Sequence, residues 1–574
     1  MRWLLAVGVI ALAPVAQPPN SLVVLADDLG IENLAVYGSR TSSVPPPTPT
    51  IDALAARGVL FRNFWSQPEC TPTRASLMTG RYAMHNAVGS VNIPHGGTLE
   101  LAETTFAEHL ADASYAAAAF GKWHLSYLTT GARQAPNLQG FTQFAGTYAG
   151  AVDPSYYSYE YVVNGSVSTS TTYNTTQIVD DAIAWLATAP EPWVCYVAFN
   201  APHSPYHAPP SQLHSYDLEG LDPTTDPIPF YKAMIEAMDT ELGRLLGALG
   251  PTTTRTDVWF LGDNGTPDAV VEAPLRPARV KSSAYEGGVN VPLIVAGPSV
   301  GAPGRTEGGL AHVVDLFATL ADTAGLPPCP KWLACDGRSL RPYLQSSGGA
   351  PVRDAMVSER FIGLDPNRNG FACIRGERFK LIRRYPTGQE EYYDLSLDPM
   401  EQSDLLAGSL SPAQLLSLEQ LRNELTVLRA ARSQVELFGT AQCAGSNGNP
   451  RLSVRGLPTI GQSHAIALAD GATTSAAVLL GGASRASLGA VPLPLALATL
   501  GGGPRCSLYT SYEAIWPTLT DGSGDASLTM QVPDMPILVG ATMHHTWLVL
   551  DPTAPENPLG LTASDAARTV FGRP

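Results

Sequence analysis

Short continuous runs of apolar residues recur through the first half of the chain, and three of them end in clusters of polar residues. Four such runs stand out, at 21–26, 192–199, 257–261 and 291–296. Apolar runs of this length, bounded by turn residues, predict strands that are buried on both faces. The stretches between them have the spacing of helices, at 51–57, 74–79, 100–112, 176–187, 230–248 and 312–324. Strands that alternate with helices predict an α/β fold built on a mostly parallel sheet.

Polar clusters follow the predicted strands directly. They read Asp27-Asp28-Leu29-Gly30 after the first strand, NAPHSP after the second and GDNG after the third. In parallel α/β sheets, ligands bind beyond the carboxyl ends of the strands. The sequence therefore predicts a functional site at that edge of the sheet.

Two further regions follow the α/β part. Residues 353–436 indicate a small α+β subdomain, with strands and a final helix at 371–374, 379–384, 391–394 and 411–430. From residue 437 the helical periodicity stops, and Gly, Ser, Thr, Leu and Val dominate between closely spaced turn signals. This pattern is typical of a β-sandwich. We expect a β-rich accessory domain over 437–574, as a passive structural module rather than a catalytic one.

The first 19 residues have the features of a secretory signal peptide. Arg2 supplies a positive charge, residues 3–12 are apolar, and small alanines follow. The apolar run is too short to cross a bilayer, which takes about 20 residues. The alternative is a buried first strand, but the run at 21–26 fits that role better. We expect an exported protein, periplasmic or extracellular, with no stable membrane insertion, and the cleavage site stays open.

Composition narrows the functional classes. The chain has 574 residues, of which 44% are hydrophobic, which is enough for a large core. Lys and Arg number 35 against 51 Asp and Glu, so the net charge is −16. Because nucleic-acid binding depends on basic surfaces that neutralise phosphates, we expect no nucleic-acid partner.

Export permits disulfides, and the seven cysteines suggest two. Cys329 and Cys335 flank a short loop that they could close, and Cys443 and Cys506 could form a second bridge near the C-terminus. Cys195 lies in an apolar run and is expected to be a buried thiol. Another cysteine, at position 70, lies in polar sequence between two prolines, where packing does not explain it.

Four polar side chains at two strand ends suggest a metal site. Asp27 and Asp28 follow one strand, and Asp263 and Asn264 follow another. Adjacent carboxylates repel each other unless a cation holds them. Three carboxylates and an amide oxygen form a set of hard ligands that suits Ca²⁺ or Mg²⁺ rather than Zn²⁺. Either pair alone would be weak evidence, because both also occur in ordinary turns.

The segment 70–81 reads CTPTRASLMTGR and resembles the signature of the sulfatase family, C-x-P-x-R followed by x-x-L-x-T-G-R. In that family the cysteine is oxidised after translation to Cα-formylglycine, which implies the same change at Cys70. One hydroxyl of the hydrated aldehyde attacks sulfur to give a sulfo-enzyme intermediate, and the other later expels sulfate. Thr73 stands where serine or alanine is commoner, which leaves C-x-P-x-R intact.

The resemblance extends over about residues 20–430. Segments that match family motifs in the same order are NSLVVLADDLG (20–30), GKWHL (121–125), APHSPY (201–206), GDNG (262–265), KSSAYEGGVNVP (281–292) and YDLSLDPMEQSDL (393–405). Two departures are Gly262, where the family has serine, and Asn290, where it has arginine. The second could alter loop packing but leaves Lys281 in place.

The resemblance implies an alkaline-phosphatase-like fold, with the mostly parallel sheet flanked by helices, a catalytic domain at 20–352 and the small α+β subdomain behind it. It implies catalytic roles for Cys70, Arg74, Lys122, His124, His203 and Lys281. The metal ligands would be Asp27, Asp28, Cys70, Asp263 and Asn264, with Ca²⁺ expected before Mg²⁺. His203 and Lys281 would assist the leaving alkoxide, His124 would help to remove the proton from the second hydroxyl, and the three cationic side chains would hold the anionic transition state.

The expected activity is hydrolysis of sulfate monoesters of aryl compounds or carbohydrates, after a formylglycine-generating enzyme has modified Cys70. One alternative is a phosphate or phosphonate ester hydrolase with the same residues. Another is a non-catalytic exported binding protein, if Cys70 is not converted. Two nearby histidines are alternatives to His203, namely His207 and His214; the motif favours His203, and His207 is a candidate for the substrate pocket only. Six other histidines are expected to be structural or to form no readable metal pattern: His85, His95, His109, His312, His544 and His545.

Overall fold

The structure is a computed structural model, and it describes residues 17–571 with internal gaps. The gaps fall at 39, 92–96, 102, 128–130, 331–334, 347, 363–368, 430–433, 439–444, 456–457, 459–462, 485–486, 489–490, 494, 497–505, 533–540 and 554–559. Most of the expected signal peptide, His95 and Cys443 therefore lie outside the described residues.

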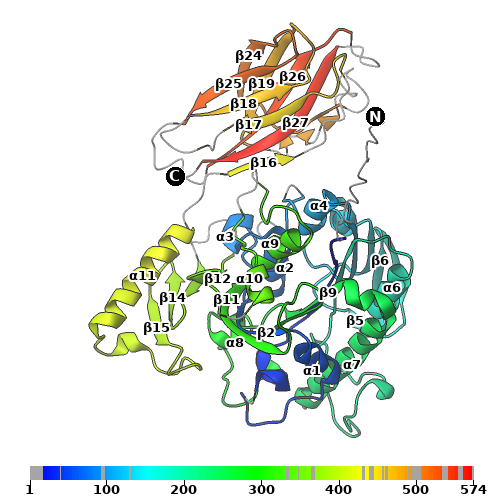
Figure 1. Cartoon of the computed structure of the whole chain (residues 1–574), viewed down its shortest axis with the longest axis vertical. Coiled ribbons are helices and arrows are strands. Elements are labelled where there is room, and N and C mark those ends of the chain that lie inside the picture. The colour runs from blue at the N-terminus through cyan, green and yellow to red at the C-terminus, as the bar shows by residue number, and fades with distance from the viewer. Residues whose placement is uncertain are drawn as a thin grey trace, which may run out of the picture.

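The centre of the protein is an eleven-stranded mixed sheet (Figure 1). Its order is β11 (Arg305–His312), β2 (Val59–Trp65), β10 (Leu293–Ala296), β9 (Thr256–Gly262), β1 (Asn20–Ala26), β8 (Trp193–Ala198), β3 (Ala116–Lys122), β4 (Gln143–Thr147), β6 (Ser158–Val163) and β5 (Pro154–Ser155), with β7 (Ser166–Ser170) paired to β6. The five consecutive strands from β9 to β4 run parallel. All four predicted strands are present.

The strand β10 departs from the parallel arrangement, since it runs antiparallel to both β9 and β2. The chain leaves β9 at its carboxyl end and reaches β10 through a segment that contains Lys281. Lys281 contacts Asp28, which follows β1 at this same edge of the sheet. The segment never crosses the sheet, so the strand that follows it has to run back in the opposite direction.

Helices cover both faces of the sheet. Strand β1 shows how, because Val23 and Leu25 face one core cluster while Leu22 and Val24 face the other. Helices α2 (Cys70–Thr79), α4 (Phe106–Ala111) and α9 (Asp315–Thr323) contribute to the first cluster. Helices α1 (Pro49–Ala56), α6 (Asn174–Leu186) and α7 (Pro227–Ala248) contribute to the second. The shorter helices are α3 (Ala83–Asn86), α5 (Ala135–Leu138), α8 (Glu286–Val289) and α10 (Arg341–Gln345). No helix in the described part of the chain has the length and apolar content needed to cross a membrane.

Several predicted helix starts were wrong, by three residues for α7 and α9 and by more for α2 and α4. Helix α4 begins at Phe106 rather than at residue 100, because Thr105 and Glu108 form a capping box that fixes its start. Helix α2 begins at Cys70, four residues before the predicted start, with Pro72 in its first turn. Proline is tolerated there, because the first turn of a helix leaves its N–H groups without helical partners.

The small α+β subdomain packs a four-stranded antiparallel sheet against one helix. The strands are β12 (Met356–Arg360), β13 (Gly370–Arg375), β14 (Phe379–Tyr385) and β15 (Glu390–Asp394), and the helix is α11 (Pro412–Arg429). Leu418, Leu421 and Leu425 of α11 pack into the core of this sheet. The three predicted strands and the helix are present, and β12 is an additional strand.

The C-terminal residues form two further sheets, drawn in colours from yellow through orange to red in Figure 1. One has five strands, in the order β16 (Gln434–Phe438), β27 (Leu561–Val570), β26 (Thr542–Leu550), β19 (Ala476–Gly482) and β24 (Ala514–Leu519). The other has three, in the order β17 (Arg451–Arg455), β18 (Ser463–Ala469) and β25 (Ala526–Gln531). Two-residue pairs join β20 (Ser487–Leu488) to β21 (Val491–Pro492) and β22 (Leu495–Ala496) to β23 (Ser507–Leu508).

These two larger sheets share one core, in which Leu452 and Ile466 of the smaller sheet pack with Leu479 and Trp547 of the larger. Two sheets with a common apolar interior form a sandwich, as the composition predicts. Strand β16 already pairs with β27, so residues on both sides of position 437 belong to these sheets.

The cysteines mostly behave as predicted. Cys329 and Cys335 are joined by a disulfide. Cys506 is disulfide-bonded, and its expected partner Cys443 lies outside the described residues. Cys195 is fully buried in β8 as a free thiol.

The C-terminal sandwich should lose stability in mild acid because of His545. This side chain is fully buried, and burial together with the nearby His464 and His544 lowers its pKa to about 3. In the unfolded chain His545 binds a proton near pH 6.5, whereas in the folded protein it does so only near pH 3. Between these values, protonation stabilises the unfolded chain relative to the folded protein. We expect a loss of at most about 1.4 kcal/mol per pH unit from this group between pH 6.5 and pH 3.

Urea unfolding at pH 7.5 and pH 5.0 tests this expectation, with His545→Gln as the comparison. Glutamine retains a donor for the contact that His545 Nε2 makes with Thr569 Oγ1 at 3.1 Å, but it does not titrate. The variant should lose less stability on acidification than the parent. An equal loss in both proteins would show that His545 does not contribute.

Candidate active site

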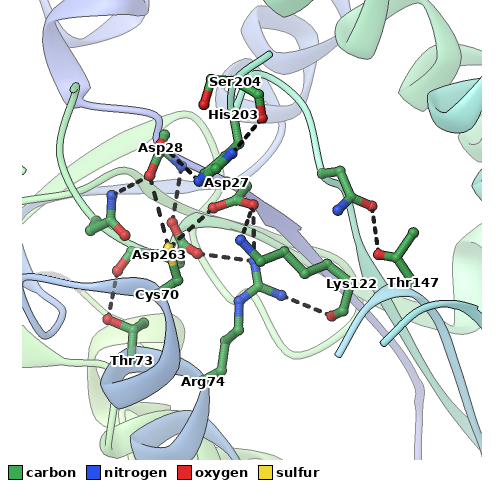
Figure 2. Close-up of polar contacts among 12 residues, drawn as sticks. Asp27, Asp28, Cys70, Thr73, Arg74, Lys122, Thr147, His203, Ser204 and Asp263 are labelled. Carbon is green, nitrogen blue, oxygen red and sulfur yellow. Dashed lines mark hydrogen bonds and ion pairs between the residues drawn. The ribbon is translucent and has the colours of Figure 1, made fainter. Parts of the chain in front are cut away.

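Polar side chains from separate segments of the chain meet at the carboxyl edge of the parallel strands (Figure 2). Asp27 and Asp28 follow β1, His203 follows β8 and Asp263 follows β9, while Lys122 is the last residue of β3. The order β9-β1-β8-β3 places these ends side by side. The polar clusters predicted from the sequence therefore converge because their strands are parallel neighbours.

Cys70 is the first residue of α2 and is 1% exposed, so it lies in the interior of the site. The structure corrects the view of Cys70 as a cysteine in a polar loop that packing does not explain. Its Sγ lies 3.4 Å from Oδ1 of Asp27 and 4.0 Å from Oδ1 of Asp28. Burial raises the pKa of the thiol well above its usual value. An unmodified Cys70 is therefore a neutral thiol and a poor nucleophile, since the thiolate is the reactive form.

The predicted metal ligands are brought together. Ligand atoms of Asp27, Asp28, Cys70 and His203 lie within 4.8 Å of one another. Asp263 is adjacent, with its Oδ1 accepting a hydrogen bond of 3.0 Å from the backbone N–H of Asp28.

Asn264 completes the predicted ligand set. Its Nδ2 donates to Oδ1 of Asp28 at 2.7 Å, while its Oδ1 is buried and has no hydrogen-bond partner among the described residues. Three carboxylates and an unsatisfied amide oxygen at one point fit a hard divalent cation such as Ca²⁺ or Mg²⁺.

Three cationic side chains face the carboxylates. Lys122 Nζ lies 2.5 Å from Asp27 and Lys281 Nζ lies 2.5 Å from Asp28. Arg74 donates to Asp263 at 2.9 Å and also to the backbone carbonyl of Lys122 at 2.9 Å. Three positive and three negative charges thus balance within one site, before any cation or substrate is added.

Burial and charge pull the pKa values of the carboxylates in opposite directions. Burial acts to raise the pKa of Asp27, but the positive charges of Lys122, His203 and Arg74 outweigh it and hold that pKa well below its usual range. Burial and the negative charge of Asp27 raise the pKa of Asp263 to about 7. The carboxylates compete for positive charge, and a divalent cation would relieve that competition.

His203 presents one ring nitrogen to the site. Its Nδ1 donates to the carbonyl oxygen of Ser204 at 2.7 Å, which leaves Nε2 directed towards Asp28 Oδ2 at 3.7 Å (Figure 2). The hydroxyl of Tyr156 lies 2.7 Å from the carbonyl oxygens of both Asn200 and His203 and so holds this loop. The side chain of His203 is 18% exposed, so incoming substrate can reach it.

His124 lies beside the site without a described hydrogen bond from its ring to Cys70. Its backbone has a positive φ of 54°, and a side chain on Gly150 would collide with the ring. Its Nδ1 is buried and has no partner among the described residues. Burial and the positive charges of Lys122 and Arg74 lower the pKa of His124 well below 6.5. The imidazole of His124 is therefore neutral, and its protonated form is disfavoured.

Four other histidines make contacts of their own outside the cluster of carboxylates. The ring of His207 lies 4.2 Å from that of Tyr156, within a cluster that includes Tyr157 and Tyr173, and burial lowers its pKa to about 4. The structure thus places the half-buried ring of His207 in an aromatic cluster on the same loop as His203. The others are held by separate contacts: His85 by Asp336, His109 by Phe317 and Pro327, and His312 by Ser358.

Several residues that position the site were not found from the sequence. Thr73 donates to the carbonyl oxygen of Asp263 at 2.6 Å, and Tyr231 donates to that of Asp28 at 2.7 Å. Thr73 stands inside the motif, so its hydroxyl was a signal that could have been used. Tyr231 comes from α7, far away in the sequence, and no local pattern marks it or Tyr156.

The two departures from the family motifs fit their surroundings. A Cβ on Gly262 would lie 2.7 Å from the carbonyl oxygen of Leu29, so glycine allows this close approach. Asn290 donates to Glu286 at 3.0 Å and leaves Lys281 free to reach Asp28.

Comparisons with known proteins agree with this geometry. The family model for sulfatases matches residues 19–326, and a model described as N-sulphoglucosamine sulphohydrolase, C-terminal, matches residues 280–431. Arylsulfatase A of Homo sapiens is 30% identical over 490 residues, which cover 75% of this chain and 91% of that protein. N-acetylgalactosamine-6-sulfatase of Rattus norvegicus is 29% identical over 380 residues, which cover 59% of this chain and 68% of that protein.

Solved structures show the same fold. The crystal structure of Ps i-CgsB in complex with k-i-k-neocarrahexaose superposes with a TM-score of 0.60 at 23% identity, over 72% of this chain and 93% of that one. A protein solved with its substrate D-glucosamine-2-N,6-O-disulfate gives a TM-score of 0.58 at 20% identity, over 72% of this chain and 98% of that one. At these identities the likeness establishes the fold alone, which is the alkaline-phosphatase-like fold of sulfatases. The family model covers more than half of the chain, and the arylsulfatase A match covers most of that enzyme, so the chain belongs to the sulfatase family of enzymes.

Proposed function

We propose that this protein hydrolyses sulfate monoesters of carbohydrates or aryl compounds, with Cys70 converted to Cα-formylglycine as the source of the nucleophile. The observation that carries the proposal is the position of Cys70, which is buried at the start of α2 among three carboxylates and three cationic side chains. As a thiol in this environment it is unreactive, so the site needs the modified side chain to act.

We propose Ca²⁺ as the cofactor, held by Asp27, Asp28, Asp263 and Asn264 together with the modified side chain of residue 70. When bound, the cation would supply positive charge that polarises the reacting oxygens. The lowered pKa of Asp27 keeps this carboxylate ionised and therefore able to bind a cation. The oxygen-rich donor set supports Ca²⁺ ahead of Mg²⁺, which demands stricter octahedral geometry.

The cationic side chains are placed to bind the sulfate group and to stabilise negative charge. Lys122 is paired with Asp27, and Lys281 is paired with the adjacent Asp28. In the proposed complex, the two lysines lie on either side of the sulfate group. Burial acts to lower the pKa of Lys281, but the negative charge of Asp28 acts in the opposite direction and outweighs burial, so the pKa is raised. Lys281 therefore stays protonated and can stabilise the leaving oxygen. The ring of His124 lies close enough to Lys122 and Arg74 to feel their charges, and this position supports the proposed role of His124 in removing a proton when sulfate is released.

His203 should matter most for substrates with poor leaving groups. Its Nε2 faces the site, so it can give a proton to the departing oxygen. General acid catalysis contributes ~10²–10⁴-fold when the leaving group is basic. We expect His203→Ala to lower kcat about 100-fold for a carbohydrate sulfate but about tenfold or less for an activated aryl sulfate such as 4-nitrophenyl sulfate. An equal loss on both substrates would contradict this role.

A panel of esters tests the proposed reaction. The modified protein is offered aryl, choline and carbohydrate sulfates together with 4-nitrophenyl phosphate and a phosphonate ester. Faster turnover of the sulfates supports the proposal, and faster turnover of the phosphorus esters favours the alternative hydrolase. The mass of the peptide that contains residue 70 separates a third case, because conversion to formylglycine lowers it by about 18 Da. An unconverted cysteine and no turnover would indicate a non-catalytic binding protein.

The setting of this activity is also a proposal. The relatives named above act, by their names, on sulfated aminosugars or aryl sulfates, which supports a sulfated glycan or small sulfate ester as the substrate. An N-terminal segment typical of secretion supports export, and a formylglycine-generating enzyme would be the partner needed for maturation. We propose 1–19 as the signal peptide, 20–352 as the catalytic domain, 353–436 as its subdomain and 437–574 as the accessory domain, with strand β16 extending the sheets of the accessory domain back to Gln434.

A further inference from the structure

A cavity of about 320 Å³ opens next to the proposed sulfate site, at the carboxyl end of β4. The side chains that give it chemical character are those of Arg133, Tyr148, Asp153, Tyr159 and Glu160. Ligand sites in proteins commonly enclose ~300–1,000 Å³, so the cavity can accommodate a small ligand or one unit of a larger one.

The cavity adjoins the segments that carry two of the proposed catalytic residues, Lys122 and His124. Its residue Thr147 pairs with Lys122 across β3 and β4, and neighbouring strands lie only ~4.8 Å apart. The backbone N–H of His124 donates to the carbonyl of Tyr148 at 3.3 Å, and the ring of His124 packs against Gly150 in the same loop. A substrate that is bound at Lys122 and His124 and continues along the sheet edge would enter this cavity.

The side chains of the cavity offer complementary groups for a sugar. Arg133 forms a two-point pair with Glu160, with Nε at 3.0 Å and Nη2 at 2.7 Å, which sets donors and acceptors side by side. Such a pair can accept and donate hydrogen bonds to neighbouring hydroxyls of one ring. The guanidinium also lies over the Tyr148 ring, 5.4 Å from its centroid, and this cation–π contact helps to hold Arg133 in place.

The charge of the cavity selects the kind of sugar. Arg133 contributes one positive charge, while Asp153 and Glu160 contribute two negative charges, so the lining residues carry a net charge of −1. A second sulfate would be repelled there, in contrast to the cationic site around Lys122 and Lys281. The cavity therefore suits a ring that carries hydroxyls and no anionic group.

We propose that this cavity is a subsite for an uncharged sugar unit that adjoins the sulfated unit, so that the substrate is an oligosaccharide with sulfate-free neighbours. The inference rests on the proposed function, since it assumes that the sulfate group is bound beside Lys122. The subsite adds to the proposed function the class of substrate, an oligosaccharide, and the residues that would bind the sugar next to the sulfated one.

The test compares the same sulfated unit alone and within a longer chain. The probes are N-acetylgalactosamine 6-sulfate and D-glucosamine 2-N,6-O-disulfate, each as the monosaccharide and as the terminal unit of a tetrasaccharide whose other units are uncharged. We then use whichever of the two sulfated sugars the parent hydrolyses faster. With that sugar, the kcat/KM of the parent should be higher on the tetrasaccharide than on the monosaccharide. In Arg133→Ala and Glu160→Gln the ratio of the two kcat/KM values should fall roughly tenfold, which corresponds to about 1.4 kcal/mol.

Two further variants make the outcome decisive. Ala151→Trp fills the exposed side of the cavity without removing a hydrogen bond, and it should lower the same ratio. Arg255→Ala is the matched control, because Arg255 forms the same two-point pair with Glu191 at 3.1 and 2.8 Å away from this cavity, and it should leave both rates at the parent values. Thermal unfolding confirms that each variant is folded.

The results separate the subsite from the reaction. Unchanged ratios in Arg133→Ala, Glu160→Gln and Ala151→Trp would overturn the subsite while leaving the proposed function standing. If the parent hydrolyses no sulfate ester, the proposed function fails, and calorimetric titration of the parent and of Arg133→Ala with the desulfated tetrasaccharides decides the subsite. Tighter binding by the parent would support it, and no binding by the parent would overturn it.

Discussion

Cys70→Ala should abolish sulfate ester hydrolysis while the protein still folds. Alanine cannot be converted to formylglycine, so the proposed nucleophile is removed together with its contact to Asp27 at 3.4 Å. Removal of a nucleophile from a catalytic group of this kind costs ~10⁴-fold or more in kcat. We expect turnover of 4-nitrophenyl sulfate to fall by at least that factor, measured against a parent whose residue 70 is shown by mass spectrometry to be converted.

Cys195→Ala is the matched control for this experiment. Cys195 is also a fully buried free thiol, but it lies within β8 and makes no described contact with the site. Its substitution should lower stability by about 1–2 kcal/mol, through the loss of packing, and retain activity. Turnover at the parent rate by Cys70→Ala would disprove the proposed nucleophile.

Cys70→Ser gives a second, independent result. A serine at position 70 has one hydroxyl where the hydrated aldehyde has two, so it can attack sulfur but cannot release sulfate by reforming an aldehyde. We expect a slow single turnover that leaves a sulfated serine, which raises the mass of the peptide by about 80 Da, the mass of SO₃. Continuous turnover by this variant would contradict a mechanism that depends on two hydroxyls.

Removal of divalent cations should reduce activity about 10³-fold or more, because the site would lose several kcal/mol of charge stabilisation. Chelation would also leave Asp27, Asp28 and Asp263 facing one another with only the three cationic side chains as counterions. We expect the melting temperature to fall on chelation, and Ca²⁺ to restore both activity and stability better than Zn²⁺, which prefers nitrogen and sulfur ligands.

Two aspartates at opposite ends of β9 provide the control for the metal experiment. Asp263 lies at the carboxyl end, in the site, whereas buried Asp257 lies near the amino end and accepts hydrogen bonds from Ser299. Asp263→Asn should lose activity and show little change in melting temperature on addition of Ca²⁺. Asp257→Asn should keep the Ca²⁺-dependent shift of the parent. Full activity in metal-free parent protein would rule out the metal site.

The sequence determined the parts of the fold that depend on local pattern. Strands β1, β8 and β9 were predictable because each is a buried apolar run, and the same runs are followed by the polar residues that form the site. The motif at 70–81 identified Cys70 and Arg74, since its residue types and spacing are specific in themselves. The sandwich at the C-terminus was predictable from composition, because short alternating strands leave a recognisable pattern of turns.

Only the tertiary structure decided how these elements meet. Strand β10 has the same apolar character as its neighbours, and its antiparallel direction follows from the path of the chain through Lys281. The burial of Cys70 depends on contacts with Asp27 and Asp28, about forty residues away, and the hold of Tyr231 on Asp28 spans 203 residues. Local sequence carries no information about such distant partners. The cavity beside β4 is likewise formed by Arg133, Tyr148 and Glu160, whose side chains become a single surface only when β3, β4 and β6 pair and bring their loops together.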